Sequence, residues 1–276
     1  MEKKLLKSLL KYGLILAAIL LIVFVVIFWD KMVFALKYDV EFDEKLDGYV
    51  LIDIAIHHGE KLELPKYTAS GESIVGAGNL FSRKHFFVDY SSIEYLVIPD
   101  GYKTLETACT KKPIQFGKLI SLKKIEIGAG LESGIYGGVF NQNSQLSVIE
   151  IDDNNQKYYS TGNCIIERES GTLIAGCGSS VIPEGVKTIG QAAFVNSNIK
   201  SVVIPKSVVK ICTSAFYECT ELEYLYIPIN VSVLEKKAIY SCSKLTVYCE
   251  SSLIPDGWEE DCFESVITVV FASTAK

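Results

Sequence analysis

The sequence contains few of the residues that build a catalytic or metal-binding site. It has three His among 276 residues, and its eight Cys include no C-x-x-C pair joined to a second pair at zinc-ligand spacing. The Gly-x-Ser-x-Gly elbow of hydrolases and the lysine-bearing phosphate loop are both missing. The sequence therefore predicts a protein that is not an enzyme and that has no catalytic residue, no cofactor and no metal.

Runs of positive charge are also scarce. Lys and Arg total 27 against 33 Asp and Glu, which gives a net charge of -6, and no basic run follows the first dozen residues. A protein that holds nucleic acid through its phosphates needs a basic patch. The composition therefore argues against nucleic acid as a partner.

The N-terminus carries a long apolar stretch. Every residue from Leu14 to Trp29 is apolar, and residues 12–29 carry no charge. A helix of this length spans about 27 Å, which nearly crosses a bilayer. Because Lys residues precede it, we expect a cytoplasmic tail at residues 1–11, a transmembrane signal anchor at 12–29 and an extracytoplasmic remainder at the cell membrane. The alternative is a cleaved signal peptide, in which case the protein is secreted.

A unit of about 23 residues repeats in the second half of the chain. Ile-Pro dipeptides begin at Ile182, Ile204 and Ile227, at spacings of 22 and 23 residues. Ten residues after each Pro stands an Ala, followed by an apolar residue and, in two copies, by Cys219 or Cys242. Weaker copies lie upstream, one of them containing Ala108 and Cys109, so that the array covers residues 60–250.

The unit predicts a short strand and a short return segment. Apolar residues alternate over four to six positions before each Pro, and Pro ends strand pairing. One unit cannot bury its own apolar face, so successive units must stack. We therefore expect a repeat solenoid at residues 60–250, preceded by a linker and N-terminal capping strand at 30–59 and closed by a C-terminal cap at 251–276.

The motif Leu-x-x-Ile-x-Ile-Pro followed by Ala-Phe-x-x-Cys resembles the BspA-like leucine-rich repeats of bacterial and protozoan surface proteins, most closely over residues 146–258. Residues 152–160 and 171–174 are similar to the inserted hairpin of that family, and Val247–Glu250 with Pro255–Trp258 to its closing motif. The resemblance implies an extracytoplasmic leucine-rich repeat fold that serves adhesion or protein recognition.

The outward strand positions are where a solenoid usually presents its binding surface. Tyr side chains offer a large contact area at little entropic cost, so Tyr224, Tyr226 and Tyr248 are the first candidates for partner contacts. Glu126 and Glu150 fall on the same face of neighbouring units and are further candidates. The alternative for each of these positions is an ordinary exposed residue of high β-propensity.

The cysteines fall into two groups. Cys219 and Cys242 occupy the same inward position of successive units and are expected to be buried free thiols. If Ser170 and Gly171 form a two-residue hairpin turn, Cys164 and Cys177 lie opposite each other, within reach of a disulfide bond. A metal site built on His57, His58 or His85 is not expected, since neighbouring strand residues point to opposite faces.

Two functions fit these features. The first is a membrane-anchored binding protein that recognises a protein or glycan, of unknown identity, at the cell surface and mediates adhesion. The second is a structural or regulatory scaffold of the cell envelope that has no external ligand. Crosslinking in intact cells separates the two, because a scaffold finds its partners within the same membrane.

Overall fold

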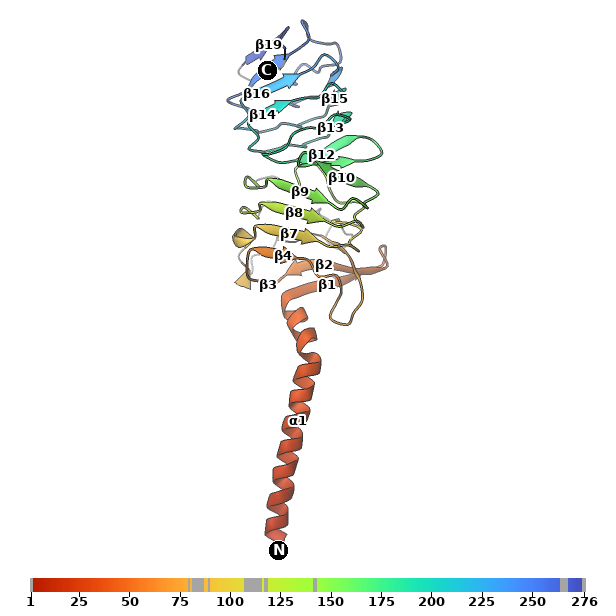
Figure 1. Cartoon of the computed structure of the whole chain (residues 1–276), viewed down its shortest axis with the longest axis vertical. Helices are drawn as coiled ribbons and strands as arrows, with labels where there is room; N and C mark the ends of the chain where they lie inside the picture. The colour runs from red at the N-terminus through yellow and green to blue at the C-terminus, as the bar shows by residue number, and fades with distance from the viewer. Residues whose placement is uncertain are drawn as a thin grey trace.

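The computed structural model describes residues 2–78, 80, 87–88, 90–106, 116, 119–140, 143–263 and 268–274; for residues 2–14, 16, 26–27, 56 and 87–88 it describes the backbone alone. The chain forms one long helix followed by a β-solenoid, with the two termini at opposite ends of the molecule (Figure 1). Ala108 and Cys109 of one predicted repeat, and His85, lie outside the described residues.

The helix α1 (Glu2–Lys37) leads directly into β1 (Tyr38–Asp43). Residues 30–59, where we expected a linker and one capping strand, therefore contain the end of α1 and the strands β1, β2 (Gly48–Ile54) and β3 (Ile56–His57). Within the described residues, no single helix is long and apolar enough to cross a membrane. Two segments, Ala17–Val25 and Phe28–Lys37, meet that condition only together, and they are bent by 47°.

A small sheet covers the N-terminal end of the solenoid. The strand β2 lies between β1, to which it is antiparallel, and β5 (Ile74–Ala77), to which it is parallel. Beside it, β3 pairs with β6 (Phe87–Val88), and a short 3-10 helix, η1, covers Tyr90–Ser92. Phe34 of α1 and Tyr38 of β1 pack against the buried residues beneath this sheet, so the helix end and the first turns share a core.

The first ladder sheet contains four parallel strands in chain order, β4 (Lys61–Glu63), β7 (Tyr95–Ile98), β8 (Lys124–Ile127) and β9 (Val148–Ile151). The second ladder sheet contains β14 (Ser201–Val203), β16 (Tyr224–Ile227), β18 (Thr246–Cys249) and β19 (Thr268–Val270). Each strand belongs to one turn, and its alternate residues point into the core. The predicted solenoid is therefore confirmed for both sheets.

Three antiparallel strands, which together form the inserted hairpin, lie between the two ladder sheets. They are β10 (Tyr158–Thr161), β11 (Cys164–Glu167) and β12 (Thr172–Gly176). The last of these strands pairs in parallel with β13 (Thr188–Ile189), which continues through β15 (Lys210–Ile211) to β17 (Val233–Leu234). The insertion predicted at residues 152–174 is present and reaches Gly176.

The Ile-Pro dipeptides mark the ends of the second-sheet strands. The Ile204 N–H donates to the Tyr226 carbonyl at 3.0 Å, and the following Pro has no N–H with which to extend the ladder. Ile204 and Ile227 follow the paired residues Val203 and Tyr226, and both are buried. Ile182 is buried among the same side chains but lies outside any strand, so the predicted column is regular over two of its three members.

The return segments, which connect the strands of successive turns, contain a repeated backbone feature that cannot be predicted from residue type. Pairs of non-Gly residues four positions apart adopt positive φ in successive turns: Ala192 and Asn196, Ser214 and Glu218, Lys237 and Ser241. This left-handed conformation is uncommon for residues with a Cβ. Backbone bonds between turns hold it, including Phe194 N–H to Ala215 O and Phe216 N–H to Ala238 O, both 2.8 Å.

Phe216 lies at the centre of these return segments, fully buried and stacked on Phe194 with ring centroids 5.1 Å apart. We predict that Phe216→Ala lowers the free energy of unfolding by about 3–5 kcal/mol, because it removes a large buried ring and leaves a cavity. Leu253→Ala is the control, since that side chain is 76% exposed and its loss should change stability by less than about 0.5 kcal/mol. Urea unfolding followed by circular dichroism measures both, and equal effects would contradict the assigned core.

Candidate binding surface

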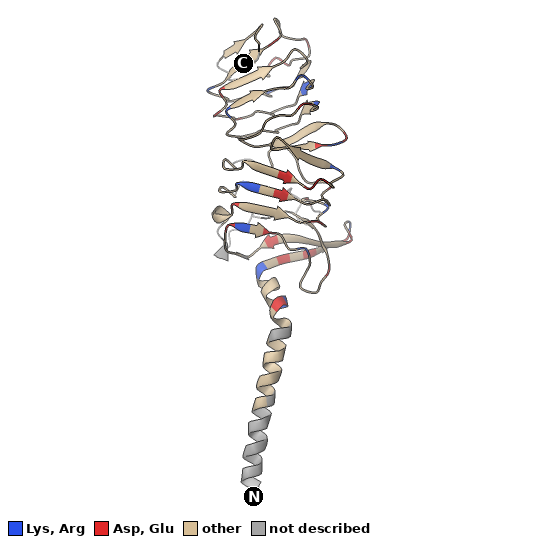
Figure 2. Cartoon of the chain, viewed as in Figure 1, with Lys and Arg blue, Asp and Glu red and all other residues tan. Residues whose placement is uncertain are grey.

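The outward face of the first ladder sheet is strongly charged. Strand register aligns its outward residues into two rows, which are Lys61, Tyr95, Lys124 and Val148 in one and Glu63, Val97, Glu126 and Glu150 in the other. Five of these eight residues carry charge. On the ribbon, positions of Lys and Glu are accordingly coloured on β4 and β8, and a position of Glu on β9 (Figure 2).

Lys124 holds the two predicted Glu residues together. Its Nζ lies 2.9 Å from Glu126 Oε1 and 2.8 Å from Glu150 Oε2. Hydrogen bonds from this ammonium group, first to Glu150 and then to Glu126, raise the pKa of Lys124. Adjacent strands bring the two carboxylates close enough to repel, and the shared cation offsets that repulsion.

A groove of about 330 Å³ runs along one edge of these rows. Glu63, Glu126 and Glu150 form its floor together with the ends of their strands, and the loops that follow add Lys66, Asp100 and Asp152. Asp100 and Asp152 are held by local backbone bonds, because each Oδ1 accepts an N–H at 2.8 Å, from Ala129 and Asn154 respectively. Five of the six charged residues that line the groove are therefore carboxylates.

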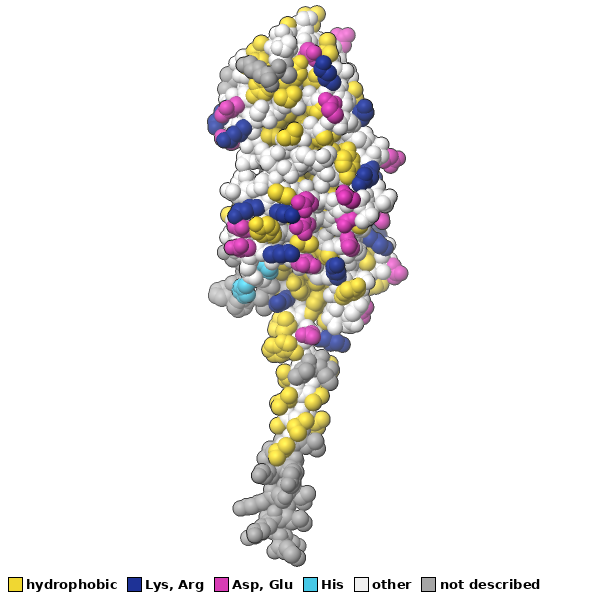
Figure 3. Space-filling view, in the orientation of Figure 1, with side chains coloured by type: hydrophobic (Ala, Val, Ile, Leu, Met, Phe, Trp, Pro, Cys, Tyr) yellow, Lys and Arg dark blue, Asp and Glu magenta, His cyan; other side chains and the backbone are white. Residues whose placement is uncertain are grey.

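The outward face of the second ladder sheet carries no formal charge on its strands. Its rows are Ser201, Tyr224, Thr246 and Thr268 in one and Val203, Tyr226, Tyr248 and Val270 in the other. In the space-filling view charged side chains gather over the part of the solenoid near α1, and hydrophobic ones over the part near the C-terminus (Figure 3). Hydroxyl groups and rings dominate this second face.

The three predicted Tyr residues all lie on this face, but they are not equally accessible. Tyr224 and Tyr248 are half-buried, and their ring centroids are 4.9 Å apart at a tilt of 32°. Tyr226 is 5% exposed, so the expectation that it is an open surface residue is wrong. Its strand also places it between Val203 and Tyr248 of the neighbouring strands, and these flanking side chains cover it. Contact of any of these residues with a partner stays a prediction.

The structure does not bring the two groups of candidates together. Glu126 and Glu150 belong to the first ladder sheet, Tyr224 and Tyr248 belong to the second, and the inserted hairpin separates the sheets. The chain therefore presents two candidate surfaces of different chemistry instead of one.

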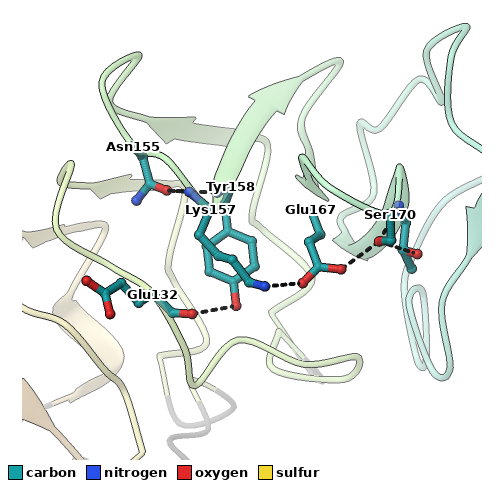
Figure 4. Close-up of polar contacts among 7 residues, drawn as sticks. Glu132, Asn155, Lys157, Tyr158, Glu167 and Ser170 are labelled. Carbon is teal, nitrogen blue, oxygen red and sulfur yellow. Dashed lines mark hydrogen bonds and ion pairs between the residues drawn. The ribbon is translucent and has the colours of Figure 1, made fainter.

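The predicted opposition of Cys164 and Cys177 is wrong by one residue. Strands β11 and β12 are joined by four residues, 168–171, and Cys164 pairs with Gly176. An irregularity follows, since Ile165 pairs with Ala175 but Ile166 pairs with Leu173. The Ser170 hydroxyl donates to Glu167 at 2.6 Å and fixes this longer turn (Figure 4).

Both thiols of this pair are free and buried, and crosslinking between them stays a prediction. Burial raises the pKa of the Cys164 thiol to about 12, which keeps it neutral and poorly nucleophilic. Cys219 and Cys242 are buried free thiols, as predicted, and their Sγ–H groups donate to the carbonyls of Phe194 and Phe216.

Among the described residues, no group of three or more His, Cys, Asp or Glu side chains is arranged to hold a metal ion. The Nε2 of His57 lies 3.1 Å from the Gly59 carbonyl, to which its N–H can donate. Partial burial is the main cause that lowers the pKa of His57, so this residue is neutral over most of the physiological range.

The contact of Lys124 with both Glu126 and Glu150 can be tested by mutation. We predict that Lys124→Met lowers the melting temperature at low salt, because Glu126 and Glu150 then repel each other without a cation between them. In about 1 M NaCl the screening length falls to about 3 Å, and the difference from wild type should shrink. Lys61→Met is the matched control, since its Nζ lies 3.9 Å from one carboxylate, that of Glu63, and its loss should have a smaller effect. A salt-independent loss for Lys124→Met would show that it acts by packing.

Comparison with known proteins adds a family assignment to this geometry. Residues 175–268 match the sequence model of the BspA type leucine rich repeat region, in six copies. Comparison with the curated proteins gives no match.

Several solved structures are similar to the chain in arrangement. A leucine rich cell surface protein of Faecalibacterium prausnitzii A2-165 has 13% identity and a TM-score of 0.37, with 86% of this chain and 94% of that chain covered. The T. pallidum leucine rich repeat protein has 18% identity and a TM-score of 0.41, with 84% and 83% covered. A leucine-rich repeat protein of Eubacterium ventriosum has 12% identity and a TM-score of 0.32, with 87% and 94% covered.

The match begins at the end of β12, covers β14, β16 and β18 with their return segments, and ends at the first residue of β19, which includes the region where the Ile-Pro and Ala-Phe spacing is most regular. Residues 175–268 of the chain thus consist of repeats of the BspA leucine-rich type, in six copies.

Proposed function

We propose that this protein is a membrane-anchored, extracytoplasmic binding protein that recognises a protein or glycan through the outward face of the second ladder sheet. The observation that carries the proposal is the contrast between the two faces. A face whose outward rows hold rings and hydroxyl groups without charge sheds water at low cost, and Tyr is enriched at binding interfaces for this reason. The proposed activity is recognition, not catalysis.

The exposed residues around this face support a contact surface. Val203 is 45% exposed and Val270 36%, and the loops that follow the strands add Ile229 at 65% and Leu253 at 76%. Scattered apolar residues are normal on a protein surface, whereas a contiguous group marks an interaction site. Val203 and Val270 share an outward row with Tyr248, and Tyr224 lies in the neighbouring row, so that the strand residues of this face adjoin one another.

The apolar N-terminal helix and the direct junction of α1 with β1 support the anchor. The side chains described between Ala17 and Val25 are apolar and exposed, as a lipid-facing helix requires. Four Lys residues precede this stretch in the sequence, at positions 3, 4, 7 and 11, which favours an N-terminus in the cytoplasm. The solenoid then stands outside the cytoplasm with its second ladder sheet far from the membrane.

The binding face is tested with a soluble form, residues 33–276, which retains Phe34 and its packing on the first core. Partners captured from the cell exterior are identified, and the affinity of each is measured for Tyr224→Ala combined with Tyr248→Ala. We predict at least a tenfold loss, or about 1.4 kcal/mol, because truncated Tyr side chains at a contact lose buried area.

The matched control is Tyr217→Ala combined with Tyr240→Ala. These two rings also stack, with centroids 5.1 Å apart, but they lie in the return segments and not in the ladder sheet. Affinity that falls only in this control would move the contact to the return side. Affinity that falls only for Glu126→Gln with Glu150→Gln would move it to the first ladder sheet.

The topology is tested separately. We predict that protease added to intact cells removes an epitope placed after the last residue, whereas an epitope before the first residue survives until the cells are opened. The physical reason is that a charged tail preceding an apolar helix stays in the cytoplasm. Western blotting of both epitopes measures the outcome, and protection of the C-terminal epitope in intact cells would refute an extracytoplasmic solenoid.

A further inference from the structure

The buried apolar residues form two separate clusters, and the inserted hairpin is part of both. The first core extends from Leu51 to Cys177, and the second from Cys164 to Cys262. Their ranges overlap only within the hairpin. A regular solenoid would instead have one continuous core, because every turn packs on the next.

The hairpin strands are buried on both faces. On β11, Ile165 belongs to the first core, whereas its neighbours Cys164 and Ile166 belong to the second. On β12, Leu173 belongs to the second core, and Ala175 to the first. Successive residues of a strand point to opposite faces, which accounts for β11, and the register irregularity lets Leu173 and Ala175, two positions apart, also face different cores. These two strands therefore lie across the solenoid as a partition.

Polar contacts hold this partition in shape. The ammonium of Lys157, the residue before β10, pairs with Glu167 of β11 at 2.7 Å, and the Asn155 Oδ1 accepts the Tyr158 N–H at 2.7 Å (Figure 4). Gly176 lies against Phe194, since a Cβ there would be 2.1 Å from the Phe194 Cε1 atom. The parallel pairing of β12 with β13 attaches the hairpin to the second core.

The row of parallel ladder strands is interrupted at the hairpin. The first ladder sheet ends at β9, and the second begins at β14. At the edge of β9, a hydrogen bond to a hairpin side chain takes the place of backbone pairing with a further strand. The Ile151 N–H donates to Ser160 Oγ at 2.9 Å. Ser179 Oγ to Ser147 O, at 2.7 Å, and Asn198 Nδ2 to Ser144 O, at 2.6 Å, also cross this boundary from side chains.

Packing at this boundary is less complete than within either core. The buried side-chain oxygens of Asn143 and Asn198 have no hydrogen-bond partner within the described part of the chain. A cavity of about 10 Å³ lies between Phe140 and Asn143 on one side and Ala193 and Asn196 on the other. The phenylalanine rings stack in separate pairs, Phe116 on Phe140 and Phe194 on Phe216.

We infer that the solenoid is built of two folding units that open independently, with the hairpin serving as the N-terminal cap of the second unit. The first unit comprises α1 from Phe34 onward and the turns to Ile151, and the second comprises the hairpin and the turns to Cys262. When the first unit opens, it exposes Ile165, Ala175 and Cys177 but leaves the second core covered. The second ladder sheet therefore stays folded while the first is open.

The native thiols report this opening in the full chain. Cys177 faces the first core, and Cys164, Cys219 and Cys242 face the second, all of them 3% exposed or less. The full chain, kept in solution by a mild detergent, is treated with N-ethylmaleimide at increasing urea concentrations, and mass spectrometry of its peptides gives the labelling rate of each Cys. We expect the labelling of Cys177 to follow a different urea dependence from that of Cys219 and Cys242, which should share one dependence.

Ile165→Ala and Ile166→Ala form a matched pair of variants. The two residues are adjacent, identical in type and 0% exposed, but they face different cores. Ile165→Ala should raise the labelling rate of Cys177 at least tenfold and change that of Cys219 and Cys242 less than twofold. Ile166→Ala should raise the rates of Cys219 and Cys242 at least tenfold.

Three outcomes would overturn the inference. The first is that the labelling rates of all four thiols share one urea dependence, which both variants shift together. The second is that Ile165→Ala raises the labelling rates of Cys219 and Cys242 as much as that of Cys177. The third is that neither variant changes any labelling rate. If an Ala variant does not fold, Ile165→Val and Ile166→Val remove a single methyl group each and test the same pattern at smaller amplitude.

Discussion

The packing of each turn on the next is the interaction on which the rest of this structure depends. A strand of three or four residues contributes only one or two inward side chains. Leu225, for example, is covered because Val202 and Val247 of the neighbouring strands lie on either side of it in the same core. Burial of this kind contributes roughly 25 cal/mol per Å² of apolar surface. An isolated turn would leave that surface exposed to water and would not gain this stabilisation. The outward rows inherit their spacing from the same packing, so the binding surface is as regular as the core beneath it.

Much of this arrangement is encoded in short-range sequence patterns. The Ile-Pro spacing and the alternation before each Pro predicted the strands, the inward position of Cys219 and Cys242, and the outward position of Tyr224 and Tyr248, because a period of two is a local property. Three features depended on neighbours that no local pattern reveals. Tyr226 is covered by residues of adjacent turns, Cys164 is displaced from Cys177 because the turn has four residues instead of two, a shift that the irregular position in β12 only partly offsets, and the positive φ of Ala192 and its counterparts is imposed by bonds between turns.

The division of the chain into two chemically different faces follows from the same construction. The core fixes only the inward residues, so outward residues vary freely from turn to turn, with Glu126 and Glu150 on one sheet and Tyr226 and Tyr248 on the other. Charged contacts on the first sheet weaken with ionic strength, whereas burial of rings on the second does not. Two surfaces on one chain can therefore respond differently to the same solution, and the inserted hairpin prevents them from merging into one.

The junction with α1 gives the two units unequal roles. Phe34 and Tyr38 pack on the first core, and the Ala55 N–H donates to the Lys37 carbonyl at 2.7 Å, so the helix end and the first unit move together. In the proposed membrane arrangement, the first unit lies next to the membrane, and the second unit carries the uncharged face at the end farther from it. At the boundary between the units, the Asn143 and Asn198 side-chain oxygens have no hydrogen-bond partner among the described residues, which costs about 1–3 kcal/mol each, so this boundary is expected to open first. The hairpin keeps the second core closed when that happens, so the outer face can remain competent to bind while its attachment to the membrane-proximal unit loosens.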